Sequence, residues 1–166
     1  TGVNVDANRK SVDILRRVRK QDRTIWAAVV SDSIAAERDT IDFFAAEETD
    51  LTGTVVPEMA SDRGKQTSIT VPCRSVASII AESAELAPNG IDFMNIDIEG
   101  MDEEAIASLA AWPQKPRMIA IETYAETIPD VMQTETFRIM SENGYDFRFQ
   151  VGLTSIYMRK DFHEGR

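Results

Sequence analysis

The chain has 166 residues, of which 43% are hydrophobic, and its formal net charge is −10 at pH 7. This length and composition suit a single globular domain with a hydrophobic core, and the negative charge argues against nonspecific nucleic-acid binding through lysine and arginine. The single cysteine, Cys73, excludes an internal disulfide, and the lack of a signal peptide or of roughly 20 consecutive apolar residues predicts a cytoplasmic protein without a membrane span.

The first half of the sequence predicts a β-α-β unit, the building block of a parallel sheet. We expect a strand at residues 2–5, a helix at 9–20 with Asn8 as its N-cap, and a strand at 24–30. Residues 40–49 fit a further strand. Residues 51–67 predict a long loop, which is either a substrate-binding lid or a variable surface insertion.

The second half alternates strands with helices. Strands are expected at 68–71, 91–98 and 117–122, and helices at 76–83, at 102–111 with three acids suited to the dipole of its first turn, and from Pro129 to Asn143. Residues 147–151 and 155–159 predict an antiparallel hairpin at one sheet edge. The elements together predict an α/β fold with a mostly parallel sheet.

Acidic residues follow four of the expected strands: Asp6, Asp32, the pair Asp97 and Glu99, and Glu122. Ligands of open α/β sheets bind at the carboxyl ends of the strands, so these acids could line a cleft for a cationic or polyhydroxylic ligand. Alternatively, each acid only marks where a strand leaves the core. Asp97 and Glu99, two residues apart on one strand face, could also share Mg²⁺ with Glu122 in a hydrolase or transferase.

Four motifs, in order, resemble the FkbM family of class I S-adenosylmethionine-dependent methyltransferases. GVNVDAN is similar to the family's second strand with its acid and asparagine, AAVVSD to its third strand, VPCRSVASII to VPxxTLDxLL, and IDFMNIDIEGMDEEAI to IDxLKIDVEGxExxVL. The resemblance covers nearly the whole chain. It implies a Rossmann-like three-layer sandwich, S-adenosylmethionine as cofactor, and methylation of a hydroxyl on a sugar, glycolipid or secondary metabolite.

The resemblance also implies cofactor contacts. Asp6 would accept hydrogen bonds from the ribose hydroxyls, with Asn8 beside it, and Ser31 and Asp32 would meet the adenine amino group. Asp97 would lie near the sulfonium methyl group as well as near the acceptor.

The implied catalytic residues are Asp97 and Glu99, whose carboxylates would attract the cationic sulfonium and orient or deprotonate the acceptor hydroxyl. Glu122 and Tyr124 would line the acceptor pocket. No metal is implied by the resemblance. The acceptor is expected to be a small molecule or glycan, and the sequence leaves its identity and the oligomeric state open.

The chain departs from the family pattern in three respects. It lacks the Gly-rich loop of the first strand, Asn95 stands where the pattern has lysine, and its one histidine, His163, lies in the C-terminal tail. Loss of the first strand would leave unpaired backbone groups in the middle of the sheet. We therefore expect native sequence before Thr1, so that residues 1–166 form a single but N-terminally incomplete domain.

Two other functions remain open at this stage. A chain without the first strand could be a catalytically incomplete scaffold or fragment. A nicotinamide-dependent oxidoreductase also carries an acid after its second strand, but the terminal hairpin and the IDIEG motif argue against it.

Overall fold

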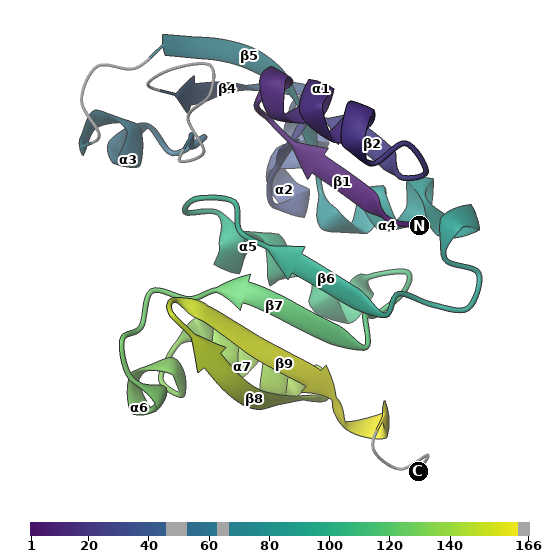
Figure 1. Cartoon of the computed structure of the whole chain (residues 1–166). Coiled ribbons are helices and arrows are strands. Elements are labelled where there is room, and N and C mark those ends of the chain that lie inside the picture. The colour runs from purple at the N-terminus through teal and green to yellow at the C-terminus, as the bar shows by residue number, and fades with distance from the viewer. Residues whose placement is uncertain (46–52, 63–66, 163–166) are drawn as a thin grey trace.

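The computed structural model describes residues 1–45, 53–62 and 67–162, and it confirms the α/β class (Figure 1). Strand β1 (Val3–Asp6), helix α1 (Arg9–Val18) and strand β2 (Arg23–Trp26) form the expected β-α-β unit, with β1 and β2 parallel. Asn8 caps α1 as predicted. Its side-chain oxygen accepts hydrogen bonds from the backbone N–H groups of Lys10 and Ser11 at 2.9 Å and 3.4 Å.

The strand predicted at residues 24–30 is wrong as a single element, because it changes partner. β2 pairs with β1, whereas β3 (Ala28–Val29) pairs in parallel with β5 (Thr67–Arg74). The change follows from the length of β1, which ends at Asp6 and turns into α1. The Ala27 N–H still donates to the Asp6 carbonyl oxygen, but the Val30 N–H donates to Arg74.

Strand β4 (Thr40–Ala45) pairs antiparallel with the other edge of β5, which gives a mixed sheet of order β3-β5-β4. Helices α2 (Asp32–Glu37), α3 (Pro57–Asp62) and α4 (Val76–Glu82) belong to the same half of the chain. The loop predicted at 51–67 contains α3, and residues 51–52 and 63–66 of this loop lie outside the described residues. The same holds for residues 46–49 of the strand predicted at 40–49. The role of the loop as a lid therefore stays a prediction.

The C-terminal half forms a four-stranded mixed sheet. Its strands are β6 (Phe93–Ile96), β7 (Met118–Glu122), β8 (Tyr145–Val151) and β9 (Thr154–Arg159), in the order β6-β7-β9-β8. β6 and β7 are parallel, and β9 is antiparallel to both β7 and β8. The predicted terminal hairpin at one sheet edge is thus confirmed.

This half of the chain also contains three helices, α5 (Asp102–Ile106), α6 (Ile128–Val131) and α7 (Glu135–Glu142). Figure 1 shows α5 and α7 behind the four-stranded sheet. The single helix predicted from Pro129 to Asn143 is wrong. Thr134 starts a new helix, because its hydroxyl accepts from the Phe137 N–H at 3.1 Å. The helix predicted at 102–111 likewise ends early, and a separate 3₁₀ turn follows at Leu109–Ala111.

Two apolar clusters form the core. The first cluster joins α4, α5 and α7 to the four-stranded sheet through residues such as Ile106, Leu109 and Ile121, all fully buried. The second cluster contains Val30, Val71 and Met101, and lies under β3, β4 and β5. None of the described helices has the length and apolar character needed to cross a membrane.

β1 and β6 belong to separate sheets, although both point towards the same side of the molecule (Figure 1). Within the described ranges, β1 pairs only with β2 and β6 only with β7, so each keeps one open edge. Phe93 on β6 is consequently 54% exposed. The parallel central sheet and the three-layer sandwich implied by the resemblance therefore stay predictions.

Candidate functional site

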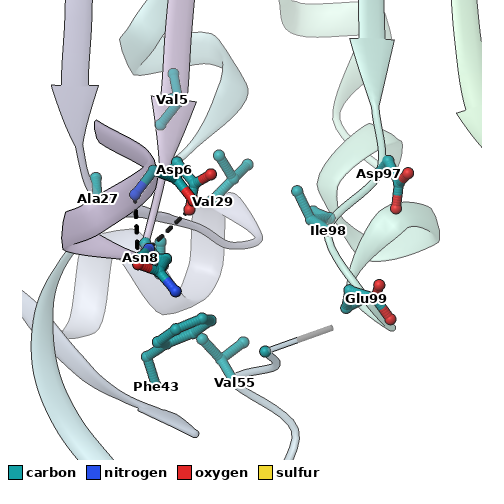
Figure 2. Close-up of a pocket in the computed structure, with 14 residues that line it drawn as sticks. Val5, Asp6, Asn8, Ala27, Val29, Phe43, Val55, Asp97, Ile98 and Glu99 are labelled. Atoms are coloured by element: carbon teal, nitrogen blue, oxygen red, sulfur yellow. Dashed lines mark hydrogen bonds between the residues drawn. The ribbon is translucent and has the colours of Figure 1, made fainter. Parts of the chain in front are cut away.

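A pocket of about 120 Å³ lies where β1 and β6 end. Its polar residues come from two segments that lie opposite each other (Figure 2): Asp6 at the end of β1 with Asn8 and Ser11 after it, and Asp97 and Glu99 after β6. Apolar side chains complete the lining, among them Val5, Val29, Phe43, Val55 and Ile98. The pocket therefore combines carboxylates with apolar surface, as sites for nucleoside-like ligands do.

Asp6 is oriented by the turn that follows β1. Its Oδ1 accepts a hydrogen bond from the Asn8 N–H at 2.7 Å, and the adjacent N-cap fixes that turn against α1. Partial burial raises the pKa of Asp6, while its bonds to Asn8 and to the Ser11 side chain oppose the rise. The side chain is thus a pre-oriented hydrogen-bond acceptor in a partly desolvated position.

The turn after β6 holds Glu99 in an unusual backbone conformation. Glu99 has φ +55° and Gly100 φ +102°. The positive φ favours glycine at position 100, and a Cβ atom there would also lie 2.2 Å from the Met59 sulfur, so that this side chain would have to move. The Thr54 hydroxyl donates to the Glu99 carbonyl oxygen at 2.7 Å.

Asp102 closes this turn from the other side. Its Oδ1 accepts from the Ile98 N–H at 3.1 Å and its Oδ2 from the Gly100 N–H at 3.3 Å. Burial and the nearby charge of Glu122 raise the pKa of Asp102 to about 6, although the two backbone bonds oppose the rise. Sequence analysis missed this residue, because it assigned all three acids of the α5 first turn to helix stability.

Electrostatic coupling extends the acidic group beyond the pocket. Burial, together with the charge of Glu99, raises the pKa of Asp97. The pKa of Tyr124 is raised by burial, by a hydrogen bond to Glu122 and by the charges of Glu122, Glu99 and Asp102. Four acids and one phenol therefore share a single electrostatic environment at the carboxyl ends of β6 and β7.

The structure thus brings together six of the eight predicted site residues. Asp6, Asn8, Asp97 and Glu99 line the pocket, and Tyr124 is close enough to be hydrogen-bonded to Glu122 and affected by the charge of Glu99.

Ser31 and Asp32 are not among the residues that line the pocket. They begin α2, where the Ser31 hydroxyl accepts from the Ile34 N–H at 3.3 Å. Their contact with adenine stays a prediction.

The acids do not form a metal-binding group. In the part of the chain that the structure describes, no three or more histidine, cysteine, aspartate or glutamate side chains are placed to hold an ion together. His163 lies outside that part.

Comparison with protein families matches residues 4–147 to the methyltransferase FkbM domain. The chain belongs to the FkbM methyltransferase family. Searches of curated proteins and of solved structures gave no match. The matched range of the FkbM domain contains both segments that line the pocket and the Glu122–Tyr124 segment, and this confirms the resemblance inferred from the four motifs.

Proposed function

We propose that this FkbM domain is an S-adenosylmethionine-dependent O-methyltransferase that acts on a hydroxyl of a sugar, glycolipid or secondary metabolite. The observation that carries the proposal is the joint lining of one pocket by Asp6 and Asn8 at the end of β1 and by Asp97 and Glu99 just after β6. Family membership supports methyl transfer in general, and the chemistry of these side chains supports the choice of donor.

The pocket residues fit the proposed donor by type. Asp6 is a pre-oriented carboxylate that can accept both hydrogen bonds of a vicinal diol, and the apolar side chains of Val29, Phe43 and Val55 offer surface for a base. Asp97 and Glu99 place negative charge opposite Asp6, where it favours a cationic sulfonium.

S-adenosylmethionine supplies an electrophilic methyl group when bound. For the acceptor, Glu99 and Asp97 would orient the hydroxyl and take up its proton, and burial together with the charge of Glu99 raises the pKa of Asp97, which favours its action as a base. Alignment of the reacting atoms contributes most of the acceleration, and general-base catalysis contributes a factor of roughly 10² to 10⁴. Glu122 and Tyr124 would line the acceptor side.

Calorimetric titration with S-adenosylmethionine and S-adenosylhomocysteine tests the proposal. We expect wild-type protein to bind both, and Asp6→Ala to weaken both by roughly 10- to 100-fold, the usual loss for hydrogen bonds to a charged group. Asp92→Ala is the matched control, because Asp92 lies before β6 and its side chain is 81% exposed and contacts only Arg117 among the side-chain interactions described. Unchanged affinity in Asp6→Ala would contradict the proposed cofactor site.

The same titration addresses the two alternatives. Folded wild-type protein that binds neither compound would favour the incomplete scaffold, for which the open edges of β1 and β6 are the supporting observation. A parallel titration with Mg²⁺ alone tests the carboxylate-cluster hydrolase or transferase, which requires a binding isotherm that Glu99→Gln abolishes.

A further inference from the structure

Glu99 is the one non-glycine residue with positive φ among those the structure describes. A side chain in this region of backbone space is disfavoured by contacts of its own Cβ, and it persists only where the surroundings impose it. Glu99 also lines the pocket, so the strained residue is one of those assigned to the proposed chemistry. The contacts that impose the conformation are therefore of functional interest.

The Asp102 carboxylate supplies the most direct of these contacts. It is 4% exposed, and its two oxygens accept one hydrogen bond each from the N–H groups of Ile98 and Gly100, the residues on either side of Glu99. The 97–98 and 99–100 peptide units, which flank the turn at Glu99, are thus held by a single side chain. Thr54 holds the Glu99 carbonyl oxygen from the opposite side.

Asp102 itself does not line the pocket, so it can reach a ligand only through the turn that it holds. Its neighbours Glu103 and Glu104 share the first turn of α5 but are exposed, so helix stability alone would not require burial of the third acid. Burial of a carboxylate is costly unless its oxygens are paired, and both oxygens of Asp102 are paired with the turn.

We propose that Asp102 is a positioning residue that holds the Glu99 carboxylate in the cofactor and acceptor site through the backbone of residues 98–100. The proposal rests on the proposed function, since it assumes that Glu99 lies near the sulfonium. Its specific consequence is that Asp102 controls how strongly the site prefers the cationic S-adenosylmethionine over the uncharged thioether of S-adenosylhomocysteine.

This control depends on pH. The titratable groups that face Asp102 among the described residues are Glu122 at the end of β7 and the Tyr124 hydroxyl, and Glu122 adds to burial in raising the pKa of Asp102 to about 6. Protonation of Asp102 places a hydrogen atom on one of its two carboxylate oxygens. That oxygen is then an O–H donor opposite an N–H donor of the backbone, so the hydrogen bond between them is weakened. Below about pH 6, Asp102 therefore holds the backbone on either side of Glu99 less firmly.

The test is the ratio of the two dissociation constants, measured by calorimetry at pH 7.5 for wild type, Glu99→Gln, Asp102→Asn and the double variant. We expect Glu99→Gln and Asp102→Asn each to lower the preference for S-adenosylmethionine by about two- to fivefold, the usual range for one partly exposed charge pair. S-adenosylhomocysteine affinity should stay within about twofold. In the double variant, Asp102→Asn should add no further loss, because its effect passes through Glu99.

Glu103→Gln, an exposed acid of the same helical turn, is the matched control and should behave as wild type. An equal loss of affinity for both ligands in Asp102→Asn, an unchanged ratio in it, or additive losses in the double variant would each overturn the proposal. Should Asp102→Asn not fold, the ratio is followed in wild type and Glu99→Gln from pH 7.5 to 5.5. Wild type should then lose preference through pH 6 more steeply, and parallel curves would overturn the proposal.

Failure of the proposed function gives a different result. If folded wild-type protein binds neither ligand, the methyltransferase proposal fails. If it binds both ligands while their ratio does not respond to Asp102→Asn, the methyltransferase proposal stands and only the role of Asp102 is refuted.

Discussion

Replacement of Glu99 by glycine should stabilise the protein. Glu99 has φ +55°, a conformation that costs an L-residue about 1–2 kcal/mol and that glycine adopts without penalty. Glycine also loses more backbone entropy on folding, about 0.5–1 kcal/mol, so a net gain of about 0.5–1 kcal/mol is expected. For a chain of this size, that gain corresponds to a rise in Tm of roughly 1–4 °C.

Glu99→Gln is the reference for this measurement, because it keeps the Cβ atom and the strained φ but removes the charge near Asp97. The free energy of unfolding of both variants is measured in urea without ligand at pH 7.5. A Glu99→Gly variant that is less stable than Glu99→Gln, at equal dependence on urea, would refute the claim that the strain is intrinsic to residue 99. Both variants should lose the preference for S-adenosylmethionine.

Three further predictions concern the supports of the site. Asn8→Ala should lower the free energy of unfolding by about 1 kcal/mol through loss of the α1 N-cap, whereas Asn8→Asp should retain it, as urea unfolding will show. Because the pKa of Asp102 is raised from 3.8 to about 6, the folded protein holds a proton there that the unfolded chain has released. Wild type should therefore gain roughly 2–3 kcal/mol relative to Asp102→Asn as pH falls from 6 to 4, and a constant difference across parallel urea titrations would contradict this. Met101→Ala and Leu109→Ala should each cost about 2–5 kcal/mol, but only Met101→Ala should also weaken S-adenosylmethionine binding in calorimetry.

Local signals in the sequence predicted the end of β1 to within one residue, whereas the strand predicted at 91–98 ends two residues earlier, at Ile96. An apolar run that stops at an acid predicts the point at which a strand leaves the core, and the structure ends β1 at Asp6 and β6 immediately before Asp97. The N-cap at Asn8 is equally local. Errors occurred where pairing decides the outcome: nothing near Trp26 indicates that the strand leaves β1 for β5 two residues later.

In the candidate site, too, local features could be predicted from the sequence, whereas features that depend on packing could not. The pairs Asp6 with Asn8 and Asp97 with Glu99 follow from strand ends, and the structure brings the two pairs to one pocket. Asp102 was not distinguished from Glu103 and Glu104, because all three acids suit a helical first turn, although the family pattern EGxE has an acid at the position of Asp102. Only packing against the Glu99 turn separates the buried acid from the exposed ones. The available signal was its position two residues after the glycine of that turn.

Orientation within each half of the pocket and placement of the halves relative to each other have different physical origins. Directional hydrogen bonds act within each half: the Asp6 carboxylate accepts one from the Asn8 N–H, and the Glu99 carbonyl oxygen accepts one from the Thr54 hydroxyl. The described β1 and β6 share no backbone pairing, so apolar packing, which includes the second cluster, holds the halves together. In that cluster Met101 packs in one group with Ala7 from the β1 side and Ile98 from the β6 side. Apolar contacts are not directional, so loss of volume there allows the halves to shift without unfolding either one. Leu109 lies in the first cluster, which contains no residue of the β1 segment, so its loss should weaken the fold while leaving the group of Ala7, Ile98 and Met101 intact.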